Sequence, residues 1–309
     1  MRILLPVDRS ESSRCAAAHI AQRISDGETL QLHVLSVQRR PRADARLNSI
    51  VSQQMIDDYV RREGSETIQQ VQSVLDLANV RYETQVAFGD IAQGIVHYAT
   101  EHHCEQIVMG TRGTGALRGF VMGSVATRVI QLTDLPVTLV TESCRTHGTS
   151  TNDAAGAGLS SHGSDTESPW RTLVAVDGSE NSERAVDHVI REVRGGAKRS
   201  IVLLNVQTPY PAGGAWDQLS AEDLAKAYQE DADSHLRVAR DRLDIAGIPY
   251  LSKVSLGAPA AVIAKTATEL ACHQIVMGTR GMGASGNLFM GSIAVKVVHL
   301  VDVPVTLVK

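Results

Sequence analysis

The strongest constraint on this 309-residue chain is an internal duplication. Residues 107–140 and 275–308 align without a gap at an offset of 168, and 21 of their 34 positions are identical. The beginnings of the two copies also correspond, since ILLPVDRSESS and LVAVDGSENS place Asp8 opposite Asp177. The period is far longer than the 20–50 residues of a solenoid repeat. We therefore expect two copies of one domain.

The segment between the copies has a different composition. Residues 142–169 are rich in Ser, Thr, Gly and Asp and contain almost no large apolar side chain. Such a segment cannot bury enough surface to offset the entropy lost on ordering, so we expect a flexible linker. The predicted organisation is domain 1 at 1–141, the linker at 142–169, and domain 2 at 170–309.

Within each copy, apolar segments alternate with amphipathic ones. The alternation predicts right-handed βαβ crossovers and a parallel sheet. The expected fold class is therefore α/β, with two tandem copies of a five-stranded, parallel, doubly wound, Rossmann-like sandwich. Strands are expected at 2–7, 30–37, 80–88, 106–110 and 135–140, and at 171–176, 201–206, 249–256, 274–278 and 303–308. In the first copy, helices are expected at 10–25, 48–78, 90–102 and 123–132.

Composition excludes several classes of function. The net charge is −4 and only 4% of residues are aromatic, so the chain lacks the basic footprint and stacking platforms of nucleic-acid binders. No apolar run approaches the roughly 18 residues of a membrane span, and Asp8 interrupts the N-terminal run too early for a signal peptide. We expect a cytoplasmic protein with neither nucleic acid nor membrane as a partner.

The cysteines and histidines suggest neither a metal centre nor a catalytic triad. The four cysteines are scattered and form no C-x-x-C pair. Cys104 and Cys272 occupy equivalent places, which favours a shared packing role. His33 lies among apolar residues of a predicted strand, so we expect a hydrogen-bonded core group, with Asn205 as its counterpart. No catalytic or metal-binding residue is predicted.

A glycine-rich loop recurs after the fourth strand of each copy. Gly110-Thr-Arg-Gly113 is followed by nine residues and Gly123-Ser124, and Gly278-Thr-Arg-Gly281 by nine residues and Gly291-Ser292. Glycine permits close backbone approach and positive φ, and a helix N-terminus attracts phosphate. Ser124 and Ser292 can cap the helix, and Asp8 and Asp177 can accept from ribose hydroxyls at the carboxyl edge of the sheet. The pattern predicts a nucleotide site.

Two familiar phosphate motifs do not fit. GMGASG at 281–286 matches G-x-G-x-x-G by letters, but its last glycine does not open a helix, and the first copy breaks the spacing. A Walker A loop needs Lys and Ser or Thr after its last glycine, and neither copy has them. Three structural alternatives stay open: a loop that only turns the chain, aspartates that only cap a helix or turn, and solvated Arg112 and Arg280.

The G-x-x-G-nine-residues-G-[S/T] pattern, the D-x-S-x-x-S opening and the final PVTLV strand resemble the universal stress protein family. The resemblance covers both copies and implies a tandem protein that binds ATP, or AMP or ADP, with or without Mg²⁺. It implies that Asp8 contacts the nucleoside and that the backbone of Val34 meets the adenine. The implied phosphate site is Gly110, Arg112, Gly113, Gly123 and Ser124. The matching residues of the second copy are Asp177, Val206, Gly278, Arg280, Gly281, Gly291 and Ser292.

Three functions remain in view. The first is a regulatory protein of the stress response that holds adenine nucleotide as a ligand. The second is a slow ATP hydrolase, which lacks expected parts because neither loop, 110–124 or 278–292, contains Asp or Glu. The third is a nucleotide-free scaffold that acts through protein partners. The resemblance also implies pairing of the two domains through 135–140 and 303–308, and a homodimer of the whole chain is compatible with the sequence.

Overall fold

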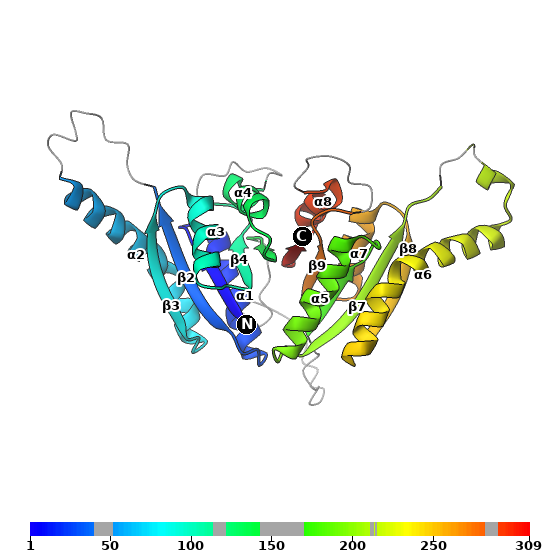
Figure 1. Ribbon diagram of the computed structural model, residues 1–309, viewed down its shortest axis with the longest axis horizontal. Helices are drawn as coiled ribbons and strands as arrows, with labels where there is room; N and C mark the ends of the chain where they lie inside the picture. Colours follow the sequence, from blue (N-terminus) through cyan, green and yellow to red (C-terminus); the bar gives the residue numbers. More distant parts are fainter. Residues whose placement is uncertain (40–51, 114–121, 143–169, 211–212, 214, 282–289) are drawn as a thin grey trace, which may run out of the picture.

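The computed structural model describes residues 1–39, 52–113, 122–142, 170–210, 213, 215–281 and 290–309. The predicted linker at 142–169 lies almost wholly outside these residues, as do the middles of both glycine-rich loops. Figure 1 shows the two halves of the chain side by side, with the long helices α2 and α6 on the outer flanks.

The order of elements is the same in both halves. The first half contains β1 (Arg2–Pro6), α1 (Glu11–Ser25), β2 (Gln31–Gln38), α2 (Gln53–Leu77), β3 (Tyr82–Phe88), α3 (Ile91–Glu101), β4 (Gln106–Gly110), α4 (Ser124–Leu132) and β5 (Val137–Val140). The second contains β6 (Trp170–Ala175), α5 (Glu180–Arg194), β7 (Arg199–Gln207), the short 3-10 helix η1 (Ala215–Gln218), α6 (Ala221–Ala246), β8 (Tyr250–Leu256), α7 (Pro259–Glu269), β9 (Gln274–Gly278), α8 (Ser292–Leu300) and β10 (Val305–Val308).

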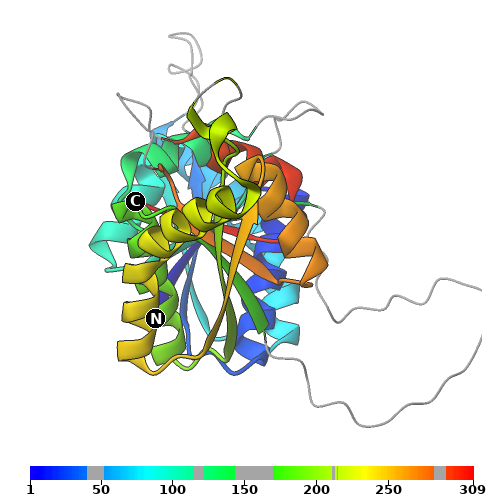
Figure 2. The same cartoon turned by 90° about the vertical axis from the view of Figure 1, so that its right-hand side faces the viewer.

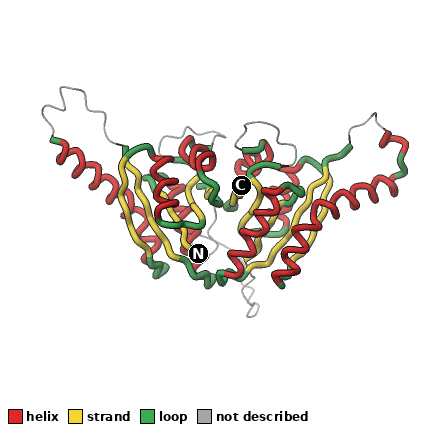
Figure 3. The backbone as a smooth tube through the Cα atoms, viewed as in Figure 1, coloured by secondary structure: helices red, strands yellow, loops and turns green. Residues whose placement is uncertain are grey.

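The strands of each half form a parallel sheet, which confirms the predicted fold class. The order is β3-β2-β1-β4-β5 in the first half and β8-β7-β6-β9-β10 in the second. The two orders meet at β5 and β10, so the described strands make one ten-stranded sheet. Figure 3 shows the strands of each half beside its helices.

Alternation along β1 divides the side chains between two helical layers. Ile3 and Leu5 are fully buried and belong to a cluster with residues of α1 and α2. Leu4 is also fully buried but belongs to a cluster with α3 and α4. Since successive strand residues point to opposite faces, the sheet is covered on both sides, as Figure 2 shows. The polar loops are thereby left at the carboxyl edge of the sheet.

Capping residues begin the helices that follow β1 and β3, as the sequence predicts. Ser10 is the N-cap of α1, where its hydroxyl accepts from the Ser13 amide, and Asp90 caps α3 through the Gln93 amide. These side chains satisfy amide groups that a helix start leaves unpaired. None of the helices in the described parts of the chain is both long and apolar enough to cross a membrane.

The junction between the halves is antiparallel. Thr138 lies opposite Thr306, with Val137 opposite Leu307 and Leu139 opposite Val305. On the face that carries α3, α4, α7 and α8, one apolar cluster continues across the junction and includes residues of both halves. On the opposite face, each half has its own apolar cluster.

Candidate functional site

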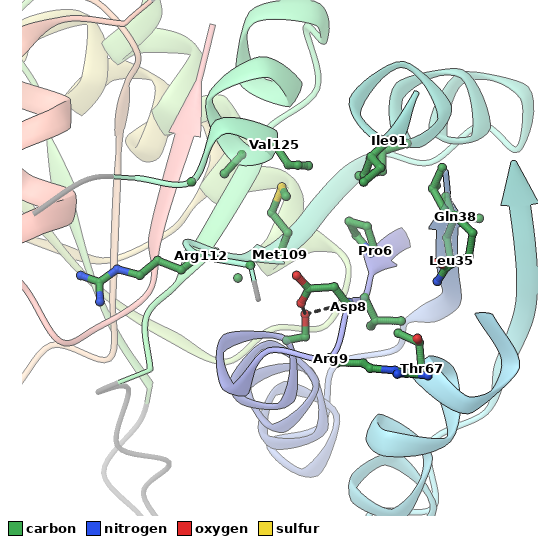
Figure 4. Close-up of a pocket in the computed structure, with 18 of the residues that line it drawn as sticks. Pro6, Asp8, Arg9, Leu35, Gln38, Thr67, Ile91, Met109, Arg112 and Val125 are labelled. Atoms are coloured by element: carbon green, nitrogen blue, oxygen red, sulfur yellow. Dashed lines mark hydrogen bonds between the residues drawn. The ribbon is translucent and has the colours of Figure 1, made fainter. Parts of the chain in front are cut away.

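A cavity of about 500 Å³ opens at the carboxyl edge of the first half. Its walls come from the segments that follow β1 and β4, from β2, and from the first turns of α3 and α4. The carboxyl ends of parallel strands are where ligands bind in open α/β sheets. Figure 4 shows Asp8, Met109, Leu35 and Ile91 around this cavity.

Asp8 uses its two carboxylate oxygens differently. Oδ1 accepts from the amide and hydroxyl of Ser10 and, at 2.7 Å, from the hydroxyl of Ser13. Oδ2 lies on the other side, toward Gly113. The turn that begins α1 therefore holds Asp8 through one oxygen, and the other oxygen faces the glycine-rich loop. The capping role and the ligand-facing role of Asp8 are compatible.

Gly113 is required for close approach, not for unusual backbone geometry. A Cβ built on Gly113 would lie 2.6 Å from Asp8 Oδ2, a distance that real Cβ atoms essentially never show. A Cβ on Gly281 would collide with Asp177 Oδ2 in the same way. Neither glycine has positive φ. Of the two reasons for glycine that the sequence offers, positive φ does not apply at these positions, and the neighbouring carboxylate leaves no room for a side chain.

Gly110 and Gly278 have a different role from Gly113. A Cβ on Gly110 would collide with the Ser12 side chain and lie 2.9 Å from the Ser12 carbonyl carbon. A Cβ on Gly278 would lie 2.8 Å from the Cβ of Asn181. Gly110 and Gly278 are the last residues of β4 and β9, and the lack of a side chain lets the end of each strand pack directly on the first turn of α1 or α5. Packing on the helix is therefore enough to require glycine at both positions, and Gly110 also lines the cavity.

The far end of each loop returns to the strand that it left. The Gly123 amide donates to the Thr111 carbonyl at 2.8 Å, and the Gly291 amide donates to the Thr279 carbonyl at 2.7 Å. Gly123 and Gly291 are the N-caps, so Ser124 and Ser292 are the first helical residues, and the expectation that these serines cap the helices is wrong. No side chain of the described residues caps either helix. Their first amide groups remain available to an anion.

Arg112 and Arg280 contribute backbone contacts. The Arg112 carbonyl accepts from the Ser12 hydroxyl, and the Arg280 carbonyl accepts from the Ser179 hydroxyl at 3.4 Å. The Arg112 side chain points away from Asp8 and toward the second half of the molecule (Figure 4), although residue 112 lines the cavity. The Arg280 side chain is exposed. In this conformation, the Arg112 guanidinium does not face Asp8.

The strand registers show that Val34 and Val206 are not equivalent positions in the two halves. Val34 is fully buried in the cluster beneath α1 and α2, and it is not among the residues that line the cavity. Leu4 pairs with His33 in β2, and the equivalent Leu173 pairs with Val202 in β7. Carrying this offset of 169 along the strands makes Val37 the counterpart of Val206. Val37 lines the cavity.

The same register corrects the expected partner of His33. Its counterpart is Val202, and Asn205 corresponds to Ser36. His33 is 7% exposed, and its Nδ1 lies 3.1 Å from the Tyr98 hydroxyl, which confirms a hydrogen-bonded core histidine. Burial lowers the pKa of His33. Among the described residues, no group of three or more His, Cys, Asp or Glu side chains could hold a metal ion.

The second half repeats the aspartate–glycine contact but has different neighbours. Arg9 is held by Glu63 at 2.9 Å and Glu66 at 3.0 Å on α2. Its counterpart is Gly178, whose φ is +80° and where a Cβ would lie 2.9 Å from Cδ2 of His235 on α6. His235 also lies 3.4 Å from the Gln207 amide nitrogen. The second site therefore has an imidazole where α6 approaches the turn after β6.

Sequence reasoning missed the apolar wall of the first cavity. Leu35, Ile91, Ile95 and Met109 line it, together with Thr67 from α2. Ile91 and Ile95 follow the predicted helix cap Asp90 by one and five residues, so they lie one turn apart on α3. That spacing, combined with the rule that ligands bind at the carboxyl edge of α/β sheets, could have predicted that both isoleucines line the site. No sequence pattern could have predicted Thr67, because α2 reaches the site only through tertiary packing.

Comparison with known proteins supports the duplication. A family model described as the universal stress protein family matches residues 1–141 and 171–309. A universal stress protein of Methanocaldococcus jannaschii is 32% identical over 142 residues, which cover 45% of this chain and 81% of that protein. One from Mycobacterium tuberculosis is 23% identical over 237 residues, covering 74% of this chain and 68% of that protein. The crystal structure of a universal stress protein from Archaeoglobus fulgidus has a TM-score of 0.63 at 22% identity, covering 100% of this chain and 96% of that one.

Proposed function

The chain belongs to the universal stress protein family, and from that premise we propose that each half binds one adenine nucleotide as a regulatory ligand in a stress response. The observation that carries the proposal is the contact between an aspartate and a loop glycine. Asp8 Oδ2 lies against Gly113, and Asp177 Oδ2 lies against Gly281. In both halves a carboxylate able to accept from a ribose therefore lies beside the loop that leads to an uncapped helix.

The walls of the first cavity suit the three parts of a nucleotide. Leu35, Val37 and Ile91 offer an apolar surface for a base. Asp8 offers an acceptor for ribose hydroxyls, and the first amide groups of α4 offer donors for phosphate. The volume of about 500 Å³ falls within the 300–1,000 Å³ typical of small-molecule sites. The ligand that we propose is ATP, with ADP or AMP as the alternatives.

Magnesium, if it accompanies the nucleotide, would be held mainly by phosphate. The described residues contain no cluster of three potential ligands, and Mg²⁺ commonly keeps several waters and binds through substrate phosphates. The hydroxyl of Ser124, which lines the cavity, could supply one protein oxygen. Such an ion would neutralise phosphate charge.

Slow hydrolysis of ATP is the second candidate. Phosphoryl transfer needs a group that orients the attacking water and carboxylates that hold the metal. Neither loop contains Asp or Glu, and Oδ1 of Asp8 is occupied by the turn that begins α1. We expect turnover below about one per minute, against the usual range of about 1–10³ per second. Magnesium-dependent phosphate release that exceeds this rate, and that disappears in Gly113→Ala/Gly281→Ala, would favour the hydrolase.

Equilibrium binding of ATP to glycine variants tests the proposal. The wild-type chain should bind two nucleotides, each with an affinity of about −8 to −9 kcal/mol. Gly113→Ala and Gly281→Ala should each leave one site, and the double variant should leave none, because each added methyl displaces an aspartate. Gly195→Ala is the matched control, since Gly195 ends α5 at a φ of −78°. An unchanged stoichiometry in the double variant would refute the assignment.

We also propose that the two halves pair within one chain through β5 and β10. The registers of both strands support this proposal, as does the apolar cluster that continues across them. A linker of 28 residues has a root-mean-square reach of about 30 Å, which would keep the halves at an effective concentration on the order of millimolar.

A further inference from the structure

The seam between β5 and β10 is symmetric and cannot by itself distinguish one half from the other. Both strands read VTLV, and Thr138 and Thr306 face each other at its centre. The Gln106 amide donates to the Thr138 hydroxyl at 2.7 Å, and the equivalent Gln274 amide donates to the Thr306 hydroxyl at 2.8 Å. Two first halves, or two second halves, could form the same seam.

The residues beside the seam break this symmetry. Arg23 on α1 and Glu192 on α5 are equivalent positions, since they are offset by 169 like Asp8 and Asp177. They carry opposite charges, and Arg23 Nη2 lies 3.1 Å from Glu192 Oε1. Both side chains are 0% exposed. The strand edges of two like halves would fit each other. At the contact between positions 23 and 192, however, opposite charges meet only when a first half pairs with a second half.

Two further charged groups complete a buried square. Glu28 accepts from Arg23 at 2.8 Å and also pairs with Arg199 of the other half. Arg199 lies 3.6 Å from Glu192. Each half contributes one arginine and one glutamate, and each arginine contacts both carboxylates. Burial opposes the charged form of Glu192, but Arg23 and Arg199 outweigh it and hold the pKa of this carboxyl far below its usual value. Glu192 and Glu28 likewise raise the pKa of Arg23 against the effect of burial, whereas burial lowers the pKa of Arg199.

The neighbouring glutamines show the same asymmetry. Arg23 Nη1 donates to Gln106 Oε1 at 3.0 Å. Gln274 is the equivalent of Gln106, but its Oε1 is buried and has no hydrogen-bond partner among the described residues. Glu192 stands where a second arginine would have to stand to donate to Gln274. Because the second half has Glu192 in place of an arginine, the amide oxygen of Gln274 is left without a donor among the described residues.

We propose that this buried cluster makes the pairing surface selective, so that the first half of the chain accepts a second half and rejects another first half. The proposal rests on the pairing of β5 with β10 put forward above. In a pair of two first halves, Arg23 would meet a second Arg23, Leu30 would occupy the place of Arg199, and each Arg23 would keep only Glu28 of its own half, 2.8 Å away, as a carboxylate partner. In a pair of two second halves, Glu192 would meet Glu192, and each would keep only Arg199 of its own half, 3.6 Å away, as an arginine partner. Like charges that meet without water strongly oppose association.

The test begins with the intact chain, purified and then cut at a protease site placed near one end of residues 143–169, so that the two halves differ in mass. Native mass spectrometry identifies the pairs that form over a dilution series in which the halves exchange. The expected species are mixed pairs alone. First–first and second–second pairs in statistical amounts would overturn the selectivity while leaving the strand pairing intact. Halves that stay single at every concentration would overturn both, and neither result depends on nucleotide binding.

Charge variants then test the cause of the selectivity. Glu192→Arg places two arginines at the contact, and Arg23→Glu places two glutamates there. Each should raise the Kd between the halves about 100-fold or more, and the swap Arg23→Glu/Glu192→Arg should recover at least about tenfold. The matched control is Glu180→Arg on the same helix, whose side chain is 75% exposed. Single variants that match wild type, or a swap no better than the singles, would overturn the proposal. Circular dichroism of the uncut variants separates weakened pairing from loss of fold. If a variant fails to fold, the mass-spectrometric count of mixed and like pairs in the cut wild-type protein still tests the proposal.

Discussion

The hydroxyl oxygens of Thr138 and Thr306 lie 2.7 Å apart, although 168 residues separate them in the chain. Both side chains are fully buried, and each also accepts from a glutamine amide of the neighbouring strand. The contact marks the centre of the antiparallel junction. Substitution of these two residues is therefore the most direct way to open the junction.

Proline at both threonines should separate the two halves. Thr138→Pro/Thr306→Pro removes two backbone donors and places rigid rings at the centre of a sheet, where proline is not tolerated. Small-angle X-ray scattering should show a larger radius of gyration than for wild type. Thr138→Val/Thr306→Val, which keeps the backbone donors, is the control and should stay closed. A wild-type protein that is already extended would contradict the pairing.

His19 should make the fold sensitive to mild acid. It is 3% exposed on α1 and faces Arg23, Arg199 and Glu192. Burial and the two arginines hold its pKa well below the ordinary value. A histidine that is neutral when folded but protonates when unfolded stabilises the fold above about pH 6.5, and this stabilisation is lost as the pH falls, at up to about 1.4 kcal/mol per unit.

Urea unfolding between pH 7.5 and 5.5 measures this effect. His19→Gln should have a shallower loss of unfolding free energy than wild type over this range, whatever its absolute stability. His97→Gln, on an exposed side chain of α3, should keep the wild-type slope. Parallel pH profiles for wild type and His19→Gln would show that His19 does not contribute.

Alanine at Gly110 and at Gly113 should have separable effects. Gly110 packs on the backbone of Ser12, so its added methyl should destabilise the fold by about 1–3 kcal/mol. Among the residues that the structure describes, the methyl of Gly113→Ala meets only the carboxylate of Asp8, so thermal unfolding should change little while ATP binding to the first half is lost. Equal loss of stability in the two variants would contradict the division of roles.

Cys104 and Cys272 should resist alkylation in the folded protein. Each is 5% exposed, and burial raises the pKa of each thiol to about 11. Because the thiolate is the reactive form, iodoacetamide at pH 8 should leave both unmodified until the protein is unfolded. Peptide mass spectrometry reads each site separately. Rapid modification of either cysteine in native protein would contradict the packing role.

The sequence predicted the elements well because local signals mark their ends. Ser10 and Asp90 cap helices as expected, and β4 and β9 have the predicted bounds. Val34 was matched to Val206 because both follow a polar residue in the second strand. The correct match to Val37 depends on the pairing of β2 with β1, which letters alone do not show.

The charged cluster shows a second limit of sequence reasoning. Arg23 and Glu192 lie on amphipathic helices, where a charged residue is normally solvated. Only the junction of β5 and β10 brings α1 and α5 close enough to bury both. The duplication offered one usable signal, which was that the equivalent positions 23 and 192 carry opposite charges. If equivalent positions meet across a twofold axis, opposite charges there make the contact selective for unlike halves.

Native mass spectrometry of the intact chain, in a mixture of ATP and GTP at equal concentrations, tests the central claim most directly because it counts and identifies the ligands at once. The account predicts two adenine nucleotides per chain, one in Gly113→Ala, one in Gly281→Ala and none in the double variant. A wild-type chain that takes up no nucleotide, or that takes up GTP as readily as ATP, would contradict it.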